Sequence, residues 1–511
     1  MSHCRGDIAR VCKLGGDGMI VFKDVSFRYA GAESEEGLHH INLEIPEGQV
    51  VLLCGESGCG KTTLTRLLNG LIPHYCDGEL TGTVMIGDQR IPNQSVQETA
   101  KNVGSVFQNP RSQFFTVDTT SELAFGCENM QWPAKSIESR ISCIADEFRI
   151  RHLLDRNLFQ LSGGEKQKIA CASVAAPNPD ILVLDEPSSN LDIAAIKDLA
   201  GFIAAWKEAG KTVIIAEHRL RYILQLADRV VYMRGGEIAE DLSASAWMRL
   251  SEARVAAMGL RPVAPVRFVS ASPQHGSDLE LQDIQCFRDK KLALSIHRLA
   301  IPSGSVIAVL GDNGAGKSTF ARCLCGLDKK EKGRFLHSGR KRSVKQRRKD
   351  SFLVMQDVGH QLFTESVSDE LRISFPRHLG EEEVSKRLQA IMQSIHIEHL
   401  KDRHPQSLSG GEKQRVAIAC AMASEKNMLF YDEPTSGLDL RHMEEVSQNI
   451  KRLQTLGTTQ FVITHDPELV ARCCDYILFL HEGQIAWKGT VDRDIVKRLE
   501  QYFSSADMAH A

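Results

Sequence analysis

Two identical heptapeptides in this chain carry residue types suited to binding a phosphate. Both read Leu-Ser-Gly-Gly-Glu-Lys-Gln, at Leu161–Gln167 and Leu408–Gln414. A serine followed three residues later by a glutamate is a capping box, which predicts that each copy begins a helix. The two glycines leave backbone N–H groups uncovered at the positive end of that helix, where an anion binds well. The candidate phosphate ligands here are Ser162, Gly164, Ser409 and Gly411.

Two glycine-rich loops offer a second set of phosphate ligands. Each matches G-x-x-x-x-G-K-[ST], follows an apolar run (Gln49 to Cys54, or Ser305 to Leu310), and in the first half precedes a helical pattern from Leu64 to Asn69. In this context the glycines let backbone N–H groups surround phosphates, the lysine reaches the outer phosphates, and the following hydroxyl binds Mg²⁺. The predicted ligands are Gly55, Ser57, Gly58, Gly60, Lys61, Thr62 and Thr63, and in the second loop Gly311, Asn313, Gly314, Gly316, Lys317, Ser318 and Thr319.

Acidic residues and a histidine follow further apolar runs in both halves. The runs at 181–184 and 428–431 end at Asp185-Glu186 and Asp432-Glu433, and those at 212–216 and 461–464 lead to His218 and His465. Ligands gather at the carboxyl ends of parallel strands, so we expect the aspartates to hold Mg²⁺, the glutamates to polarise a water, and the histidines to lie near a γ-phosphate.

A glutamine precedes each heptapeptide serine at nearly the same distance, Gln108 by 54 residues and Gln356 by 53. We expect both glutamines to contact Mg²⁺ or water. Lys317 follows Lys61 by 256 positions, Gln356 follows Gln108 by 248, and the heptapeptides, aspartates and histidines are 247 apart. A nearly constant offset over five motifs indicates an internal duplication, because chance does not repeat the same order twice.

The elements that carry these motifs predict an α/β protein with two similar domains. At 511 residues the chain is long enough for two hydrophobic cores. The prolines at 262, 265 and 273 mark a linker. We therefore expect an N-terminal tail over 1–18, a first domain over 19–260, a linker over 261–277, and a second domain over 278–511 that ends in a helix.

Composition restricts the other classes of function. The net charge of −3 gives no general attraction to nucleic acid or anionic membrane. No apolar run approaches the roughly 18 residues of a membrane span, and the first 18 residues lack the apolar core of a signal peptide. The 14 cysteines have no zinc-type spacing, so we expect reduced thiols in a cytosolic protein, with Cys54 and Cys323 in the core.

Two features have alternative interpretations. Tyr29, on an expected early strand, could stack on an adenine or belong to the core; the aligned position in the second half is Arg288, beside Phe287. Seven of the ten residues from Arg340 to Lys349 are basic. This run could bind anionic lipid or RNA, although the more common outcome for such a run is a solvated loop.

The order of phosphate loop, glutamine, Leu-Ser-Gly-Gly, Asp-Glu and histidine resembles the nucleotide-binding domains of the ABC ATPase superfamily, from about Met19 to Asp492. The resemblance implies two tandem P-loop ABC-type domains, each with a RecA-like core, an antiparallel β subdomain and a helical subdomain. It also implies two ATP–Mg²⁺ sites between domains arranged head to tail, with each phosphate loop facing the other half's heptapeptide. Asp192 and Asp439 match the family's loop that couples the two sites. Both glutamates and both histidines are present, so we expect two hydrolytic sites.

The segment after the first glutamine is more discriminating. Phe107-Gln-Asn-Pro-Arg-Ser-Gln113 with Glu122 to Asn129 resembles the ATPase subunits of energy-coupling-factor vitamin importers, here in a fused form. In that family this region forms a groove for a membrane scaffold subunit. The second half keeps Gln361 and Glu370 but has Asp357-Val358 in place of Asn-Pro, and Arg372-Ile373-Ser374 in place of Ala-Phe-Gly, so an asymmetric module is expected.

These resemblances imply an ATP-driven motor at the cytoplasmic face of the cell membrane. Its expected partners are a transmembrane scaffold and a small substrate-binding membrane subunit, and the cargo is a vitamin, a precursor or a metal ion. No nucleic acid partner is expected. The alternatives are a soluble tandem ATPase acting on ribosomes or nucleic acid, supported only by the basic run, and a tandem sugar-importer ATPase of the same size and layout.

Overall fold

The computed structural model describes residues 20–31, 37–189, 191–270, 278–288, 291–328 and 331–504. The chain divides into two compact units, residues 1–264 with 509–511 (unit 1) and residues 265–508 (unit 2). The division falls inside the stretch that the sequence predicts to be a linker. The predicted N-terminal tail and residues 271–277 lie outside the described residues, so the exact domain bounds stay a prediction.

Unit 1 contains two sheets. The smaller is antiparallel, in the order β2-β1-β4-β5, and the larger has the order β10-β9-β3-β8-β7-β6, in which only β10 is antiparallel to its neighbour. The smaller sheet consists of β1 (Ile20–Tyr29), β2 (Gly37–Ile45), β4 (Gly78–Ile86) and β5 (Gln89–Arg90). The larger consists of β3 (Val50–Gly55), β6 (Val103–Val106), β7 (Ile181–Asp185), β8 (Thr212–Ala216), β9 (Arg229–Arg234) and β10 (Glu237–Ser243). Every residue of β3, β7 and β8 is buried, which explains their apolar sequences.

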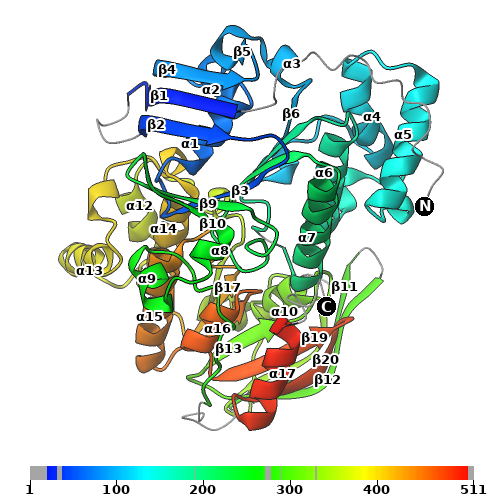
Figure 1. The fold of residues 1–511 in the computed structure, drawn as a ribbon. Helices are drawn as coiled ribbons and strands as arrows, with labels where there is room; N and C mark the ends of the chain where they lie inside the picture. The colour runs from blue at the N-terminus through cyan, green and yellow to red at the C-terminus, as the bar shows by residue number, and fades with distance from the viewer. Residues whose placement is uncertain are drawn as a thin grey trace. The chain divides into compact units, whose positions relative to one another are not determined.

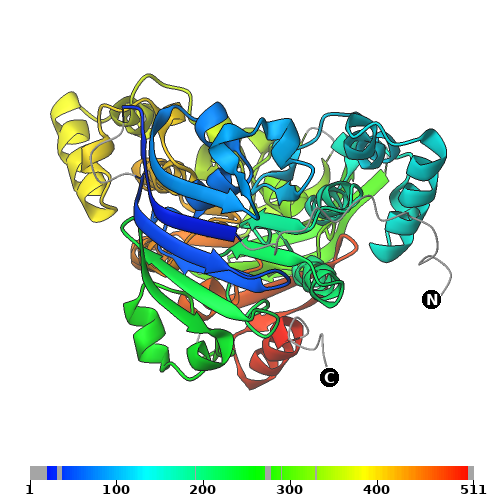
Figure 2. The same cartoon turned by 45° about the horizontal axis from the view of Figure 1, so that its top comes forward.

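The helices of unit 1 pack on both faces of the larger sheet. They are α1 (Lys61–Leu68), α2 (Leu71–His74), α3 (Val96–Thr99), α4 (Thr119–Asn129), α5 (Ala134–Glu147), α6 (Gly163–Ala175), α7 (Ile193–Glu208), α8 (Ala244–Trp247) and α9 (Glu252–Ala257). One core lies between this sheet and helices α4 to α7, and a second lies between its other face, α1 and the antiparallel strands. Helices α4 and α5, in cyan, stand away from the blue four-stranded sheet (Figure 1; Figure 2).

Unit 2 repeats this design. Its antiparallel sheet has the order β12-β11-β14-β15 and its larger sheet the order β16-β17-β18-β13-β19-β20. The strands are β11 (Leu279–Arg288), β12 (Lys291–Ile301), β13 (Val306–Leu310), β14 (Glu331–His337), β15 (Arg340–Lys341), β16 (Ser351–Val354), β17 (Met428–Asp432), β18 (Thr459–Ile463), β19 (Tyr476–His481) and β20 (Gln484–Thr490). The helices are α10 (Lys317–Leu324), α11 (Val344–Asp350), α12 (Val367–Ser374), α13 (Glu381–Ser394), α14 (Gly410–Ala423), α15 (Leu440–Thr455), α16 (Pro467–Cys473) and α17 (Arg493–Ser504). The predicted fold class, with its α/β core, antiparallel sheet and helical layer in each half, is confirmed.

Two details differ from the sequence-based expectations, and the C-terminal helix is present as expected. The helix after the first phosphate loop begins at Lys61 rather than at Leu64. Part of the expected linker is packed, because Arg261 is buried and the Phe268 ring stacks on Phe503 of α17. The C-terminal helix ends at Ser504, and residues 505–511 lie outside the described residues. Among the described residues, no helix combines the length and the apolar character needed to cross a bilayer.

Most of Arg340 to Lys349 is exposed, as a solvated segment would be, but the run is not a loop. The run forms strand β15 and helix α11, which begins with a capping box between Ser343 and Gln346. Arg347 is buried, donates to the carbonyl of Cys323, pairs with Glu331, and places its guanidinium 3.7 Å from the centre of the Phe335 ring. The count of basic residues did not predict this arrangement, because the sequence of the run does not show which arginine is buried and which are exposed.

We expect the Arg347→Ala substitution to destabilise unit 2 by about 3 kcal/mol, because it leaves the buried Glu331 carboxylate without its counter-charge. The matched control, Lys349→Ala on the exposed side of the same helix, should change stability by less than about 0.5 kcal/mol. Urea unfolding of the two variants measures both values. Equal stability of the two would show that the Arg347–Glu331 pair does not hold α11 to the sheet.

Candidate functional site

The first phosphate loop positions Lys61 at the start of α1. The Lys61 ammonium is buried and donates to the carbonyl oxygens of Gly55 and Glu56, both at 3.0 Å. The loop requires glycine at its first position, because Gly55 has φ 154° and a Cβ there would lie 2.3 Å from the carbonyl oxygen of Met233. The lysine is thus curled back over a loop of backbone groups, at the place where the motif predicts phosphates.

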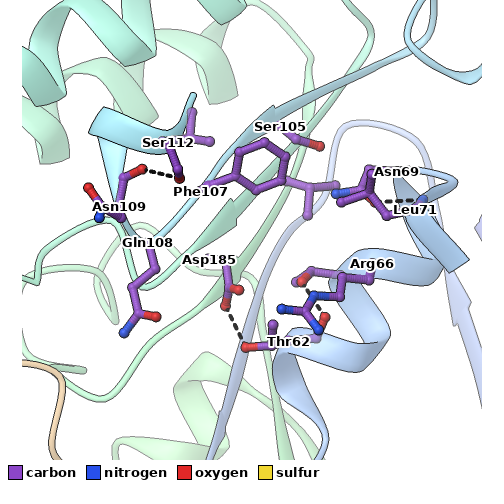
Figure 3. A pocket seen from close by; sticks show the side chains of 13 residues that line it. Thr62, Arg66, Asn69, Leu71, Ser105, Phe107, Gln108, Asn109, Ser112 and Asp185 are labelled. Carbon is purple, nitrogen blue, oxygen red and sulfur yellow. Dashed lines mark hydrogen bonds between the residues drawn. The ribbon is translucent and has the colours of Figure 1, made fainter. Parts of the chain in front are cut away.

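The predicted Mg²⁺ ligands of unit 1 converge. The Thr62 hydroxyl donates to the Asp185 carboxylate at 3.2 Å, and both line a cavity of about 260 Å³ together with Gln108 and Arg66 (Figure 3). Burial, with a smaller contribution from the charge of Glu186, raises the pKa of Asp185 to about 6. A buried carboxylate beside a hydroxyl suits a hard cation that brings its own positive charge.

These residues fit a nucleotide-bound Mg²⁺ better than a metal held by protein alone. Among the described residues, no group of three or more His, Cys, Asp or Glu side chains could hold a metal ion. Mg²⁺ commonly takes one or two carboxylates together with waters and substrate phosphates. One carboxylate and one hydroxyl per unit, beside a phosphate loop, match that pattern.

Glu186 is bound by the other two predicted catalytic residues of unit 1. Its carboxylate accepts from the Gln108 amide at 2.7 Å and lies 3.2 Å from Nε2 of His218. Burial by itself would raise the pKa of Glu186, but His218, Lys61 and the Gln108 amide hold it below its ordinary value. Glu186 therefore stays ionised, as an acceptor for a water proton must be.

The backbone also holds this glutamate in an unusual conformation. Glu186 has φ 46° and Glu433 has φ 52°, in the left-handed region that few residues other than glycine adopt. Each amide donates to the carbonyl that ends the next strand, from Glu186 to Ala216 at 2.8 Å and from Glu433 to Ile463 at 2.9 Å. The same costly geometry in both units indicates that the direction of this side chain is constrained.

Unit 2 repeats these contacts for its lysine, hydroxyl, two carboxylates and histidine. The Lys317 ammonium donates to the carbonyls of Gly311 and Asp312 at 2.7 and 3.1 Å. Burial raises the pKa of Asp432, which also has a hydrogen bond to Ser318. His465 Nε2 lies 3.6 Å from the Glu433 carboxylate.

Both heptapeptides begin helices as predicted. Ser162 starts α6 and Ser409 starts α14, and in each case the capping box is complete. The Ser162 amide donates to Glu165 at 2.8 Å, and the Ser409 amide donates to Glu412 at 2.7 Å. The box holds Gly164 and Gly411 in the first turn, where their N–H groups have no intrahelical partner.

Asp192 and Asp439 have a structural explanation that the sequence did not supply. Asp192 caps α7 by accepting from the Ala195 amide at 2.8 Å, and Asp439 caps α15 by accepting from the His442 amide at 2.9 Å. Both are buried. Each aspartate therefore has a helix-capping role within its own unit. The role of the two aspartates in coupling the ATP sites stays a prediction.

Tyr29 is half-buried and joined to the phosphate-loop helix. Its hydroxyl lies 3.1 Å from that of Thr63 and accepts from Arg66 at 3.2 Å, while its ring meets Phe27 edge-on at 4.8 Å. These contacts give Tyr29 a packing role beside the site, and stacking on adenine stays a prediction.

Sequence reasoning missed two carboxylates that brace the histidine turns. Glu217 accepts from the amides of His218 and Ser188 at 2.7 and 3.1 Å. In unit 2 the stabilising carboxylate follows the histidine in the sequence instead of preceding it. Asp466 accepts from the Thr435 hydroxyl at 2.8 Å. The two carboxylates occupy different positions of the repeat, so alignment of the halves gave no signal for them.

A family model described as "ABC transporter" matches residues 38–189 and again residues 294–436, which together exceed half of the chain. The chain belongs to the ABC transporter family. As a member of this family it is an ATPase, and its two nucleotide-binding domains are in tandem.

Relatives in the ABC family match it over nearly the full length. A Treponema denticola protein named as an ABC transporter ATP-binding protein is 45% identical over 476 residues, covering 91% of this chain and 96% of its own. YkoD of Bacillus subtilis, named for HMP/thiamine import, is 30% identical, covering 93% and 92% of the two chains.

A solved structure shows the same tandem fold. A chain in a model of ribosome-bound archaeal Pelota and ABCE1 superposes with a TM-score of 0.67 over 94% of this chain and 80% of its own, at 22% identity. At that identity the likeness concerns the fold alone.

Proposed function

We propose that the chain is the ATP-hydrolysing motor of an energy-coupling-factor importer, bound peripherally at the cytoplasmic face of the cell membrane. A transmembrane scaffold subunit docks on it, and a small membrane subunit binds the cargo, which is a vitamin, a precursor or a metal ion. The name of YkoD, a relative of the same tandem layout, supports this class of cargo.

The observation that carries the proposal is an exposed aromatic side chain that each unit holds at the same place after its loop glutamine. Phe115 is 74% exposed and Phe363 is 75% exposed. Phe115 also stacks on the Phe125 ring at 4.9 Å, and Phe159 and Val117 of the same unit are exposed. Exposed apolar side chains that gather in this way are typical of a protein interaction site.

A buried carboxylate holds each of these aromatic residues in place. Glu122 accepts from the amides of Phe115 and Thr116 at 3.1 and 2.9 Å, and Glu370 accepts from those of Phe363 and Thr364 at 3.0 and 2.9 Å. Both glutamates are buried. Buried hydrogen bonds thus hold a mostly exposed phenyl ring in each unit, and a protein partner that covers the ring would explain this arrangement.

The glutamine of the first loop connects the docking surface of unit 1 to catalysis. Gln108 is seven residues before Phe115 and donates to Glu186, which links the loop to the catalytic carboxylate. Movement of a docked partner could therefore change the position of Gln108 and the water that Glu186 polarises.

Within this proposal each ATP–Mg²⁺ is bound by residues of both units. One site combines the phosphate loop, Gln108, Asp185, Glu186 and His218 of unit 1 with the heptapeptide residues Ser409 and Gly411. The other combines the equivalent residues of unit 2, Gln356, Asp432, Glu433 and His465, with Ser162 and Gly164. Two complete sets of side chains support two hydrolytic sites.

The experiment that tests the proposal is a mild-detergent pull-down of the tagged chain from native membranes, with mass spectrometry of the bound proteins. We expect a hydrophobic scaffold and a small membrane subunit. The Phe115→Ala/Phe363→Ala variant should recover roughly tenfold less of both, as loss of central apolar contacts does. The matched control is Tyr75→Ala/Leu456→Ala, whose side chains are 76% and 74% exposed.

The control variant should recover the membrane subunits in full, and the purified Phe115→Ala/Phe363→Ala chain should keep its own ATPase rate. Recovery of ribosomal proteins or nucleic acid without any membrane subunit would refute the importer and favour the soluble ATPase. Equal losses in both variants would refute a specific role for the two phenylalanines.

A further inference from the structure

The edge of the antiparallel sheet in unit 2 carries a group of exposed basic side chains, which we call the basic edge. Its members lie on the edge strand β15 and on α11, and they are Arg340, Lys341, Lys345, Arg348 and Lys349. The segment 340–349 contains no acidic residue, and Asp350, which follows it, lies 3.7 Å from Arg342. The charge of the basic edge therefore has no carboxylate in its own segment to balance it.

Helix geometry directs the lysines of α11 outward. Arg347 faces inward, where it pairs with Glu331 over the Phe335 ring. Lys345 and Lys349 are each two residues from Arg347, which places them on the opposite side of the helix, and they are one turn apart from each other. Both lysines are exposed. Because the contacts of Arg347 hold one side of α11 against the sheet, the lysines on the opposite side face away from it.

Unit 1 provides an internal control for what the fold itself requires. Strand pairing aligns Arg340 and Lys341 of β15 with Gln89 and Arg90 of β5. The capping boxes align Lys345, Arg348 and Lys349 of α11 with Gln97 of α3 and with Ala100 and Lys101, which follow it. Two of those residues are basic, and the exposed Asp88 and Glu98 balance them. The same strand and helix thus form without excess charge.

The helix cap gives a second indication. Both caps use a serine, but the reciprocal residue is Glu98 in unit 1 and Gln346 in unit 2. Glutamine completes the box without a negative charge. Unit 2 therefore keeps the fold of this segment while omitting a carboxylate that would neutralise the lysines beside it.

We propose that the basic edge binds the headgroups of anionic phospholipids. A cluster of several lysines and arginines is attracted to an anionic bilayer by roughly 1 kcal/mol for each residue near the surface, equivalent to about fivefold in affinity per residue. Two apolar side chains adjoin it: Val344 is 39% exposed and lies against Gly326, and the following residue, Leu327, is 40% exposed.

The surroundings favour lipid over nucleic acid. Proteins that bind single-stranded nucleic acid present aromatic rings on which bases stack. The aromatic residue of the described segment 331–350 is Phe335, which is buried beneath Arg347. The lipid contact goes beyond the proposed function, because it needs neither the scaffold subunit nor ATP.

The test is co-sedimentation of the purified full chain with protein-free vesicles. We compare phosphatidylcholine alone with vesicles containing about one part phosphatidylglycerol to three parts phosphatidylcholine. We expect binding to the anionic vesicles, release in concentrated salt because ionic screening weakens surface charge, and no binding to phosphatidylcholine alone. A variant with four of the basic-edge residues replaced by glutamine should bind the anionic vesicles roughly several hundredfold more weakly. The replaced residues are Arg340, Lys341, Lys345 and Lys349.

The matched control removes four exposed lysines of unit 1, so that the loss of net charge is equal. These are Lys23, Lys101, Lys135 and Lys197. The control should bind the anionic vesicles as the unaltered chain does, and both variants should keep the basal ATPase rate, which also shows that they are folded. Equal weakening in both variants, no binding by the unaltered chain, or binding of a single-stranded RNA in place of the vesicles would each overturn the proposal. Because the vesicles contain no protein, failure here leaves the scaffold proposal standing.

Discussion

Replacing both Glu186 and Glu433 by glutamine is expected to stop ATP turnover while leaving ATP binding intact. The amide keeps the size and shape of the side chain but cannot accept a proton from the attacking water. We expect the hydrolysis rate to fall roughly a thousandfold, the usual contribution of a positioned general base. Steady-state phosphate release and equilibrium binding of ATP to the same preparation measure the two properties.

The structure makes this prediction sharper than the sequence did. Glu186 is ionised within a set of His218, Lys61 and Gln108, and a glutamine in its place loses the negative charge that His218 and Lys61 stabilise. The control is Glu138→Gln/Glu398→Gln, on exposed helical positions, which should hydrolyse ATP at the original rate. Undiminished hydrolysis in the Glu186→Gln/Glu433→Gln variant would show that neither glutamate takes part in ATP hydrolysis.

A pair of combined variants is expected to reveal which phosphate loop works with which heptapeptide. In the Glu186→Gln/Glu433→Gln background we expect about two ATP molecules to be trapped per chain, one for each set of residues. Adding Lys61→Ala with Ser409→Arg should leave about one, because both changes fall in one composite site. Adding Lys61→Ala with Ser162→Arg should leave almost none, because each site then carries a defect.

The two combinations are matched in everything but position. Both remove Lys61, and both replace the serine of a capping box, so the loss of the cap, about 1 kcal/mol, is common to them. Trapped nucleotide is counted after rapid gel filtration. If each unit formed its own site from its own heptapeptide, the two results would be exchanged, and the head-to-tail arrangement would be refuted.

The two halves of the chain are similar in their chemistry and different at their surfaces. Lysine, aspartate, glutamate and histidine occupy corresponding places in both units, and both glutamates adopt the left-handed conformation. The exposed aromatic surface around Phe115 in unit 1 includes Phe125, which stacks on Phe115. In unit 2 the residue that corresponds to Phe125 is Ile373, which is not aromatic. The basic edge belongs to unit 2. These differences agree with the sequence-based expectation of an asymmetric module.

The sequence by itself determined many of the local elements and showed the same order of candidate site residues in both halves. Capping boxes at Ser162 and Ser409 require only residues three positions apart, and the apolar runs before Asp185 and Asp432 report on burial of a parallel strand. Short-range rules of this kind depend on neighbours in the chain, and the duplication of every motif removed the ambiguity of any one of them.

Only the tertiary structure decided what the side chains between motifs do. Arg347 in a basic run proved to be a buried ion-pair partner, Asp192 and Asp439 proved to be helix caps, and Glu217 and Asp466 brace equivalent turns from non-equivalent positions. In each case the deciding partner lies on the other side of a turn or on another element. Burial and hydrogen bonding between such segments depend on three-dimensional distance, which the order of residues does not record.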